Sequence, residues 1–527
     1  MPRSTRPHTR LALAVAALAA SLCGAAAHAQ TELVIATVNN GHMIEMQKLS
    51  KNFEQANPDI KLKWVTLEEG VLRQRVTTDI ATKGGQFDVM TIGLYEAPIW
   101  GKKGWLQELK TDAAYDVDDL LPAIRNALSY EGKLYAAPFY GESSFVMYRK
   151  DLMEKAGLTM PDAPTWEFIA DAARKMTDRN AGINGICLRG KAGWGENMAF
   201  ITATSNSFGA RWFDENWKPQ FDTKEWKDTL DFYLDLMKAD GPPGASSNGF
   251  NENLALFNAG KCGMWIDATV AASFVTNPKD SKVADKVGFA LAPDNGLGKR
   301  GNWLWAWSLA IPAGTQKEEA AQKFINWATS KHYTELVASK EGWANVPPGT
   351  RTSLYANPEY AKVPFAKMTL DSINSADPTK PTVKPVPYVG VQFVAIPEFA
   401  GLATTVGQIF SAALAGEKTA DEALADEDAQ PQSGIAAARL AELKSDRWYE
   451  IRLRVTPDRI ETWLDTEKVV DIERSAFVPS CPGFASSLQP FGLAANKGVK
   501  AVLRNLRMRQ VKLAVAEGAP APLVPER

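Results

Sequence analysis

From residue 32 onward, continuous apolar runs alternate with stretches whose apolar positions recur every three or four residues. The segments at 32–38, 60–67 and 87–93 predict strands, and the helical periods at 43–58 and 71–85 predict helices between them. This β-α-β-α-β order predicts a parallel sheet covered by helices. Because ligands of such sheets bind beyond the carboxyl ends of the strands, the loops after the strands are the first candidates for a site.

A second α/β run begins after Gly141, with further amphipathic helices and short apolar strands. Two extended segments broken by Pro or Gly, at Ala136–Ser143 and Val287–Asn295, are typical of crossings between two lobes. A chain that crosses more than once forms a hinge and leaves a cleft with walls from both lobes. We therefore expect a two-lobed α/β protein with an interlobe cleft.

Three tryptophans stand at alternate positions, Trp303, Trp305 and Trp307, in the stretch GNWLWAWSLAIP. Period-two spacing predicts a strand with all three indoles on one face. Trp303 is at the turn end of this strand, so we expect its ring to face a ligand. Trp305 and Trp307 fit a core as well as a cleft wall, because aromatic side chains also fill cores.

The segment at 446–473 changes to strict period-two alternation, with turn residues at 456–458 and 465–467. This pattern predicts a β-meander, and 489–496 and 501–515 predict two more strands. The motifs RWYEIRLRV, DRIETWLD and LRNLRMR resemble the second half of a concanavalin-like (laminin-G-like) β-sandwich. A complete sandwich of that kind is longer, so we expect a partial module.

The amino-acid composition and net charge limit the kinds of molecule that the protein is expected to bind. The chain has 527 residues, 45% apolar and 23% charged, with a formal net charge of −2. This is the ordinary mixture of a globular protein long enough for two or three domains. A nearly neutral chain does not favour a nucleic-acid or anionic-membrane partner.

The N-terminus has the pattern of an export signal. A basic stretch, an Ala-rich apolar stretch and the small-residue triplet Ala27-His28-Ala29 follow one another. We expect cleavage after Ala29 and a periplasmic mature protein. A membrane anchor is the alternative, which the short length of the apolar stretch disfavours.

Three cysteines follow the predicted signal: Cys187, Cys262 and Cys481. An odd number prevents complete pairing within one chain, and no two are close in sequence. We expect them to be small buried apolar groups. No Cys/His pattern suggests a metal site, and we expect neither a metal nor a cofactor.

Five stretches carry a resemblance to a known family: FDVMTIGLYEAPIWGKKGWL, LYAAPFYGESSFVMYRKDLMEKAGL, NENLALFNAGKCGMWIDATVAASF, NWLWAWSLAIP and GWANVPPGTRTSLY. From residue 31 to about 425 the chain resembles the extracellular solute-binding proteins of carbohydrate ABC importers, especially the sorbitol/mannitol-binding group. The resemblance implies the type II fold of two α/β lobes with a hinge. It also implies closure on a sugar or polyol and delivery to an inner-membrane permease, by a protein that we expect to be a monomer.

The site that this resemblance implies fits the chemistry of a polyol. The C–H faces of a polyol pack on indole and phenol rings, and each hydroxyl left unpaired after desolvation costs about 1–3 kcal/mol. Carboxylate, guanidinium and amide groups supply the partners. The candidate ligand-binding residues are Asn39, Asn40, Glu68, Tyr95, Glu96, Tyr140, Glu142, Trp194, Asn197, Trp265, Asp267, Trp303, Trp305 and Arg351.

Some of these residues have a structural alternative. Glu68, Glu96 and Asn197 follow strands or loops where caps and solvated faces are common. Asp267 fits a cap for the segment that follows it, and Arg351 fits a surface ion pair.

The predicted organisation is a signal peptide at 1–29, lobe I at 30–138 and 288–333, and lobe II at 139–287 and 334–425. A linker at 426–445, the partial β-module at 446–513 and a disordered tail at 514–527 follow. A non-catalytic receptor is the preferred function. The alternatives are a secreted glycan-active enzyme, which needs two carboxylates about 5–10 Å apart, and a surface protein that binds glycan through the β-module.

Overall fold

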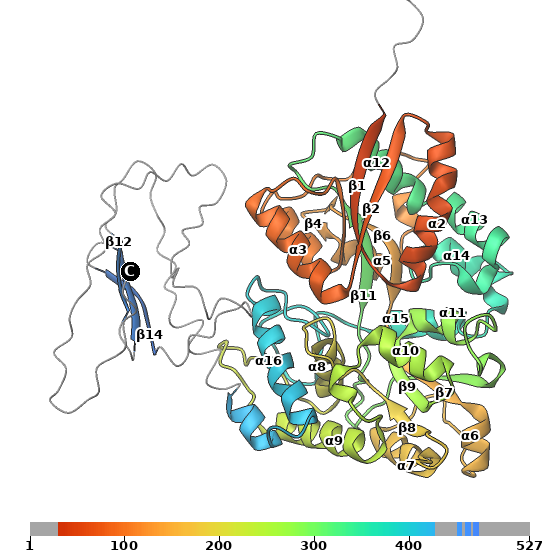
Figure 1. Ribbon diagram of the computed structural model, residues 1–527, viewed down its shortest axis with the longest axis vertical. Helices are drawn as coiled ribbons and strands as arrows, with labels where there is room; N and C mark the ends of the chain where they lie inside the picture. The colour runs from red at the N-terminus through yellow and green to blue at the C-terminus, as the bar shows by residue number, and fades with distance from the viewer. Residues whose placement is uncertain (1–29, 427–450, 456–458, 465–466, 474–527) are drawn as a thin grey trace, which may run out of the picture. The chain divides into compact units, whose positions relative to one another are not determined.

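The computed structural model describes residues 30–426 and the strands at 451–455, 459–464 and 467–473 (Figure 1). Residues 30–426 contain two main sheets, each covered by helices, and we call the parts built on them lobe I and lobe II. Within the described residues, no helix combines the length and the apolar content needed to cross a bilayer.

Lobe I is built on a five-stranded sheet of order β2-β1-β3-β11-β6. Its strands are β1 (Thr31–Val38), β2 (Ile60–Leu67), β3 (Val89–Ile92), β6 (Ala137–Glu142) and β11 (Trp305–Ala310). β1 pairs in parallel with β2 and β3, as predicted, and β11 pairs antiparallel with β3 and β6. Helices α2 (Gly41–Ala56) and α3 (Glu69–Thr82) make the predicted connections.

Lobe II is built on a four-stranded sheet of order β10-β7-β9-β8. Its strands are β7 (Ser144–Arg149), β8 (Asn184–Cys187), β9 (Cys262–Ala268) and β10 (Val287–Leu291). The helices that contact this sheet or one another include α7 (Trp166–Met176), α8 (Asn197–Ser207), α9 (Lys224–Asp240), α10 (Phe250–Asn258) and α16 (Phe399–Leu414). β9 is buried at all seven positions, which is typical of a central strand covered on both faces.

The remaining elements connect and cover the two sheets. They are α4 (Glu96–Lys102), α5 (Pro122–Ala127), β4 (Ser129–Tyr130), β5 (Lys133–Leu134), α6 (Lys150–Lys155), α11 (Ala272–Val275), α12 (Glu318–Ala328), α13 (Lys331–Glu341), α14 (Thr352–Ala356) and α15 (Ala366–Ser375).

Two of the connections between the lobes lie close to the predicted crossings. The first is at Ser143, between β6 of lobe I and β7 of lobe II. The second runs from β10 to β11, and Asn302 and Trp303 lie in it. Ser143 Oγ donates to Trp303 O at 2.6 Å, and Asn302 Nδ2 donates to Ser143 Oγ at 3.1 Å. The two connections are therefore tied together by buried hydrogen bonds.

The predicted lobe boundaries need correction in two places. β10 belongs to lobe II, because it pairs with β7 over five residues, although 288–333 was assigned to lobe I. The segment after 334 begins in lobe I, because Tyr333 of α13 packs on Trp327 and Phe139 and Leu121 N donates to Thr350 O at 2.9 Å. The hydrophobic pattern located the strands but not the sheet that each one joins.

The cysteine prediction is also wrong in part. Cys187 and Cys262 form a disulfide between the neighbouring strands β8 and β9, with a Cα–Cα distance of 5.9 Å. Their separation of 75 residues gave no sign of the pairing, because only the sheet brings the two strands together. Cys481 lies outside the described residues.

The C-terminal strands β12 (Ile451–Val455), β13 (Arg459–Leu464) and β14 (Glu467–Glu473) form an antiparallel sheet of order β12-β13-β14. This is the predicted meander. The predicted signal peptide at 1–29, almost all of the linker, the strands at 489–496 and 501–515, and the tail lie outside the described residues. The likeness to a β-sandwich stays a prediction.

Candidate functional site

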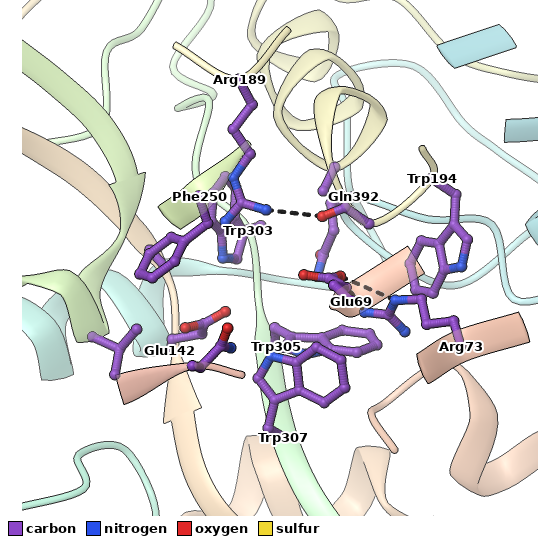
Figure 2. A pocket seen from close by; sticks show the side chains of 15 residues that line it. Glu69, Arg73, Glu142, Arg189, Trp194, Phe250, Trp303, Trp305, Trp307 and Gln392 are labelled. Atoms are coloured by element: carbon purple, nitrogen blue, oxygen red, sulfur yellow. Dashed lines mark hydrogen bonds and ion pairs between the residues drawn. The ribbon is translucent and has the colours of Figure 1, made fainter. Parts of the chain in front are cut away.

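A pocket of about 430 Å³ lies between the two lobes and takes residues from both (Figure 2). Its lining residues are Asn40, Glu69, Arg73, Glu142, Arg189, Trp194, Gly195, Ala199, Phe250, Ala268, Val270, Trp303, Trp305, Trp307 and Gln392. The described residues contain no group of three or more His, Cys, Asp or Glu arranged to hold a metal ion.

The alternating tryptophans form an aromatic wall. Trp303, Trp305 and Trp307 all line the pocket, so their common face is turned to the cleft. The Trp305 ring lies edge-to-face with Trp307 at 5.7 Å and with Trp194 of lobe II at 5.6 Å between ring centroids. The wall requires Gly93 after β3, because a Cβ there would lie 1.8 Å from the Trp305 ring.

Arg73 on α3 lies beside this wall, next to the carboxylate of Glu69 (Figure 2). Its Nη1 donates to Glu96 Oε1 at 2.8 Å, and its Nε and Nη2 donate to Glu69 Oε1 at 3.0 and 2.8 Å. The guanidinium carbon is 4.0 Å from the ring centroid of Trp194 and 4.6 Å from that of Trp307. Cation–π contacts and ion pairs thus fix this cation.

Arg189, which follows β8, is the corresponding cation of lobe II. Its Nε and Nη2 donate to Asp267 Oδ2 and Oδ1 at 2.9 and 2.6 Å, and its Nη1 donates to Gly195 O at 2.9 Å. Burial opposes the charge, but the bidentate Asp267 outweighs it and raises the pKa of Arg189 above its ordinary value. Arg189 stays charged, and both carboxyl oxygens of Asp267 accept hydrogen bonds from it.

Glu142, the last residue of β6, is a buried lining residue whose carboxyl makes no hydrogen bond to any described residue. Burial raises the pKa of Glu142 to about 8. Arg189 opposes this increase, and the nearby carboxylates of Asp267 and Glu69 add to it. The indole Nε1 of Trp305 is also buried without a partner among the described residues. Both groups have hydrogen-bonding capacity that the protein does not use.

Contacts between the lobes close the rim of the pocket. Lys191 Nζ of lobe II donates to Glu68 Oε1 of lobe I at 2.7 Å, and Asn251 Nδ2 donates to Asn39 Oδ1 at 3.3 Å. A Cβ on Gly195 would lie 2.1 Å from Glu69 Oε1, so the lobes approach there as closely as a glycine permits. The structure therefore has the lobes closed over the pocket.

A model of the bacterial extracellular solute-binding protein family matches residues 40–335, more than half of the chain. The chain belongs to this family. A mannitol-binding protein of Pseudomonas aeruginosa is 58% identical over 414 residues, which cover 78% of this chain and 94% of that protein.

Solved structures support the same assignment. An ABC transporter solute-binding protein from Agrobacterium vitis S4 with bound D-mannitol is 73% identical, with a TM-score of 0.76 over 77% of this chain and 98% of its own. One from Agrobacterium radiobacter K84 in complex with ribitol is 26% identical, with a TM-score of 0.67 over 76% and 97% of the two chains. These relatives are named as binding proteins. The expected two-lobed type II fold is confirmed.

Five of the fourteen predicted residues line the pocket of this solute-binding protein: Asn40, Glu142, Trp194, Trp303 and Trp305. Asn39 and Glu68 lie at the rim, in the contacts between the lobes. Two others hold lining residues in place. Tyr140 accepts from Asn40 Nδ2 at 2.8 Å, and Glu96 accepts from Arg73.

The remaining predicted residues are not among the lining residues of the pocket. Tyr95 lies behind the wall, with its ring 5.1 Å from Trp194 and its hydroxyl donated to Ile396 O at 2.9 Å. Trp265 is fully buried, packs on Phe250 and donates its Nε1 to Asp267 at 3.1 Å. Both rings support lining residues instead of forming the pocket surface.

Asp267, Asn197 and Arg351 are committed to the protein itself. Asp267 accepts hydrogen bonds from Arg189 and from Ala268 N. Asn197 Nδ2 donates to Gly407 O at 2.7 Å. Arg351 is buried among the carbonyl oxygens of Asp116 and Thr329, and it is not a lining residue.

Sequence reasoning missed several lining residues, chiefly Glu69, Arg73, Arg189, Phe250, Trp307 and Gln392. Two signals could have found some of them. Glu69 and Arg73 are four residues apart at the start of a helix that follows a strand, and Arg189 comes directly after an apolar strand. Gln392 has no such signal, because it lies in a loop and is held by Leu304 through two hydrogen bonds.

Proposed function

We propose that the chain is the periplasmic receptor of an ABC importer. In this proposal it binds an acyclic sugar alcohol of the mannitol class in the interlobe pocket and delivers it to an inner-membrane permease. The observation that carries the proposal is the composition of the pocket, in which indole rings from both lobes stand beside the unpaired polar atoms of Glu142 and Trp305. The named ligands of the mannitol-bound and ribitol-bound relatives point to the same chemistry.

The aromatic wall provides the surface for the carbon chain. Trp303, Trp305 and Trp307 present rings on one side of the pocket, and Trp194 and Phe250 come from lobe II. Polyol C–H groups are weakly apolar, so their contact with these rings removes apolar surface from water.

The polar atoms provide partners for the hydroxyls. The Glu142 carboxyl accepts hydrogen bonds from ligand hydroxyls, and the Trp305 indole N–H donates a hydrogen bond to a hydroxyl oxygen. A ligand hydroxyl that loses its water contacts on binding costs about 1–3 kcal/mol if it finds no partner in the pocket. These polar atoms supply such partners. Binding in this pocket therefore selects a ligand with several hydroxyls along a short chain.

The ligand is expected to stabilise the closed arrangement of the lobes, because each lobe contributes part of the pocket lining. A ligand held against Trp305 and Glu142 of lobe I gains its contacts with Arg189 and Trp194 only when lobe II closes. The ligand therefore favours the closed state by the free energy of those added contacts. The permease would recognise the closed form, and the receptor acts as a monomer without chemistry on the ligand.

The test is calorimetric titration of the purified exported protein with D-mannitol, D-sorbitol, ribitol, D-arabitol and maltose. We expect low-micromolar or tighter binding for at least one six-carbon polyol, and mass spectrometry should recover the ligand unchanged. Absence of heat with all four polyols would reject the proposal. N-terminal sequencing of the periplasmic protein should begin at Gln30 if the signal is cut after Ala29.

A further inference from the structure

We infer that the pocket discriminates by ligand charge, so that it admits an uncharged polyol and excludes the anion that carries a carboxylate in place of one terminal hydroxymethyl group. The inference deepens the proposed function and rests on it. It follows from how the charged groups around the pocket are already paired.

The two pocket cations have no free charge to offer an anion. Arg189 makes a bidentate ion pair with Asp267 and lies 3.5 Å from Glu196 Oε2. Arg73 is paired with both Glu69 and Glu96. Each guanidinium therefore has two carboxyl groups within 3.5 Å, and a ligand carboxylate would have to displace one of them.

The N-termini of α3 and α10 are occupied in the same way, whereas that of α2, which follows the lining residue Asn40, has no side-chain cap. A helix N-terminus is the usual place for an anionic ligand group in an α/β protein. Here Glu68 Oε2 accepts from Val71 N at the start of α3, at 3.3 Å. Glu252 Oε2 accepts from Gly249 N at the start of α10, at 2.9 Å. Side-chain carboxylates thus take these positions before a ligand arrives.

Glu142 adds direct repulsion when it is ionised, above its raised pKa of about 8. Its carboxyl lines the pocket without a hydrogen-bond donor among the described residues. Two guanidinium groups face five carboxyl groups around the pocket, those of Glu69, Glu96, Glu142, Glu196 and Asp267. Above pH 8, where Glu142 and Glu196 are ionised, an anionic ligand therefore enters a site that is already acidic, whereas a hydroxyl finds an acceptor there.

The experiment compares three ligands of nearly the same shape on the full exported chain at pH 9, above the pKa of about 8 of Glu142: D-mannitol, D-mannonate and the neutral D-mannonamide. We expect mannonate to bind at least about 100-fold more weakly than mannitol, because a like-charge contact costs several kcal/mol. Mannonamide should stay within about tenfold of mannitol, because it has the shape of the acid without its charge.

A pair of variants locates the effect. Glu142→Gln should reduce the mannitol-to-mannonate affinity ratio at least about tenfold, since it removes the unpaired carboxyl and keeps its shape. Glu45→Gln removes the same charge from a surface pair with Lys48 and should leave the ratio unchanged. A melting curve confirms that each variant is folded, and the wild-type comparison of three ligands decides the matter if Glu142→Gln does not fold.

The outcomes separate the two proposals. If mannitol binds and mannonate binds within tenfold of it, the charge inference is wrong and the proposed function stands. If mannonamide is as weak as mannonate, shape and not charge excludes the acid, and the inference is again wrong. If none of the three ligands binds, the proposed function fails, and the inference falls with it.

Discussion

The two lobes bring buried carboxyl groups to the pocket in opposite states. On lobe II, Asp267 receives hydrogen bonds from Arg189, Trp265 Nε1 and its neighbour Ala268 N. At the end of lobe I, the Glu142 carboxyl receives none from the described residues. Asp267 is therefore part of the scaffold that holds Arg189, whereas Glu142 keeps its hydrogen-bonding capacity for a ligand.

The largest effect on folding stability should come from removing the hydrogen-bonded carboxylate of Asp267. Asp267→Asn leaves the Arg189 guanidinium buried without its counter-charge, and we expect a loss of about 3–5 kcal/mol in folding stability. Urea unfolding followed by circular dichroism measures it. Asp118→Asn is the matched control, because Asp118 pairs with Arg125 on the surface with 90% of its side chain exposed. A loss as small as that of the control would show that Asp267 is not a structural anchor.

The second effect is a pH dependence that the Glu142 carboxyl imposes on stability. Its pKa is raised to about 8 in the folded protein, chiefly by burial, so the folded state holds a proton that the unfolded state releases near pH 4.5. The stabilising contribution is complete below the unfolded pKa and is lost as pH rises through about 8. Between pH 5 and 8 the wild type should lose on the order of 2–4 kcal/mol more than Glu142→Gln.

Melting temperatures of the two proteins, measured at half-unit pH intervals without ligand, give this difference directly. Burial also raises the pKa of Glu196 to about 8, but that residue is present in both proteins and its contribution cancels. Parallel pH curves for wild type and variant would contradict the raised pKa of Glu142.

The sequence predicted which segments reach the pocket better than it predicted what each side chain in those segments does. The family resemblance implied the role of ligand acceptor for both Glu142 and Asp267. Strand periodicity shows that Trp265 and Asp267 share a face. It does not show that this face is covered by Arg189 and Phe250, because β9 is buried on both sides.

The aromatic wall was predictable because its signal is local. The alternate spacing of Trp305 and Trp307 fixes their common face within β11, and Trp303 continues the same spacing just before the strand. By contrast, the disulfide, the sheet that β10 joins and the position of Arg351 depend on contacts between segments far apart in the chain. No local pattern encodes these contacts, so only the folded structure shows them.

A third prediction tests the role of the unpaired Glu142 carboxyl in ligand binding. Glu142→Gln should weaken D-mannitol binding about 10–100-fold, because a hydrogen bond to a charged or strongly polar acceptor contributes about 1.5–3 kcal/mol. Trp305→Phe keeps the aromatic ring and removes the unpaired Nε1 donor, so its loss should be smaller, about tenfold. Calorimetry measures both. An unchanged affinity in the Glu142 variant would remove this residue from the site.

The smallest effect should come from the rim, where the same kind of carboxyl group is partly exposed. Glu68 pairs with Lys191 across the lobes, and their side chains are 36% and 32% exposed. A solvated pair of this kind contributes about 0–1 kcal/mol, so Glu68→Gln should change mannitol affinity by no more than about fivefold. Titrations at low and high salt should converge for wild type and variant, since salt screens the pair. A loss as large as that of Glu142→Gln would mean that closure at the rim, and not the unpaired carboxyl in the interior, controls binding.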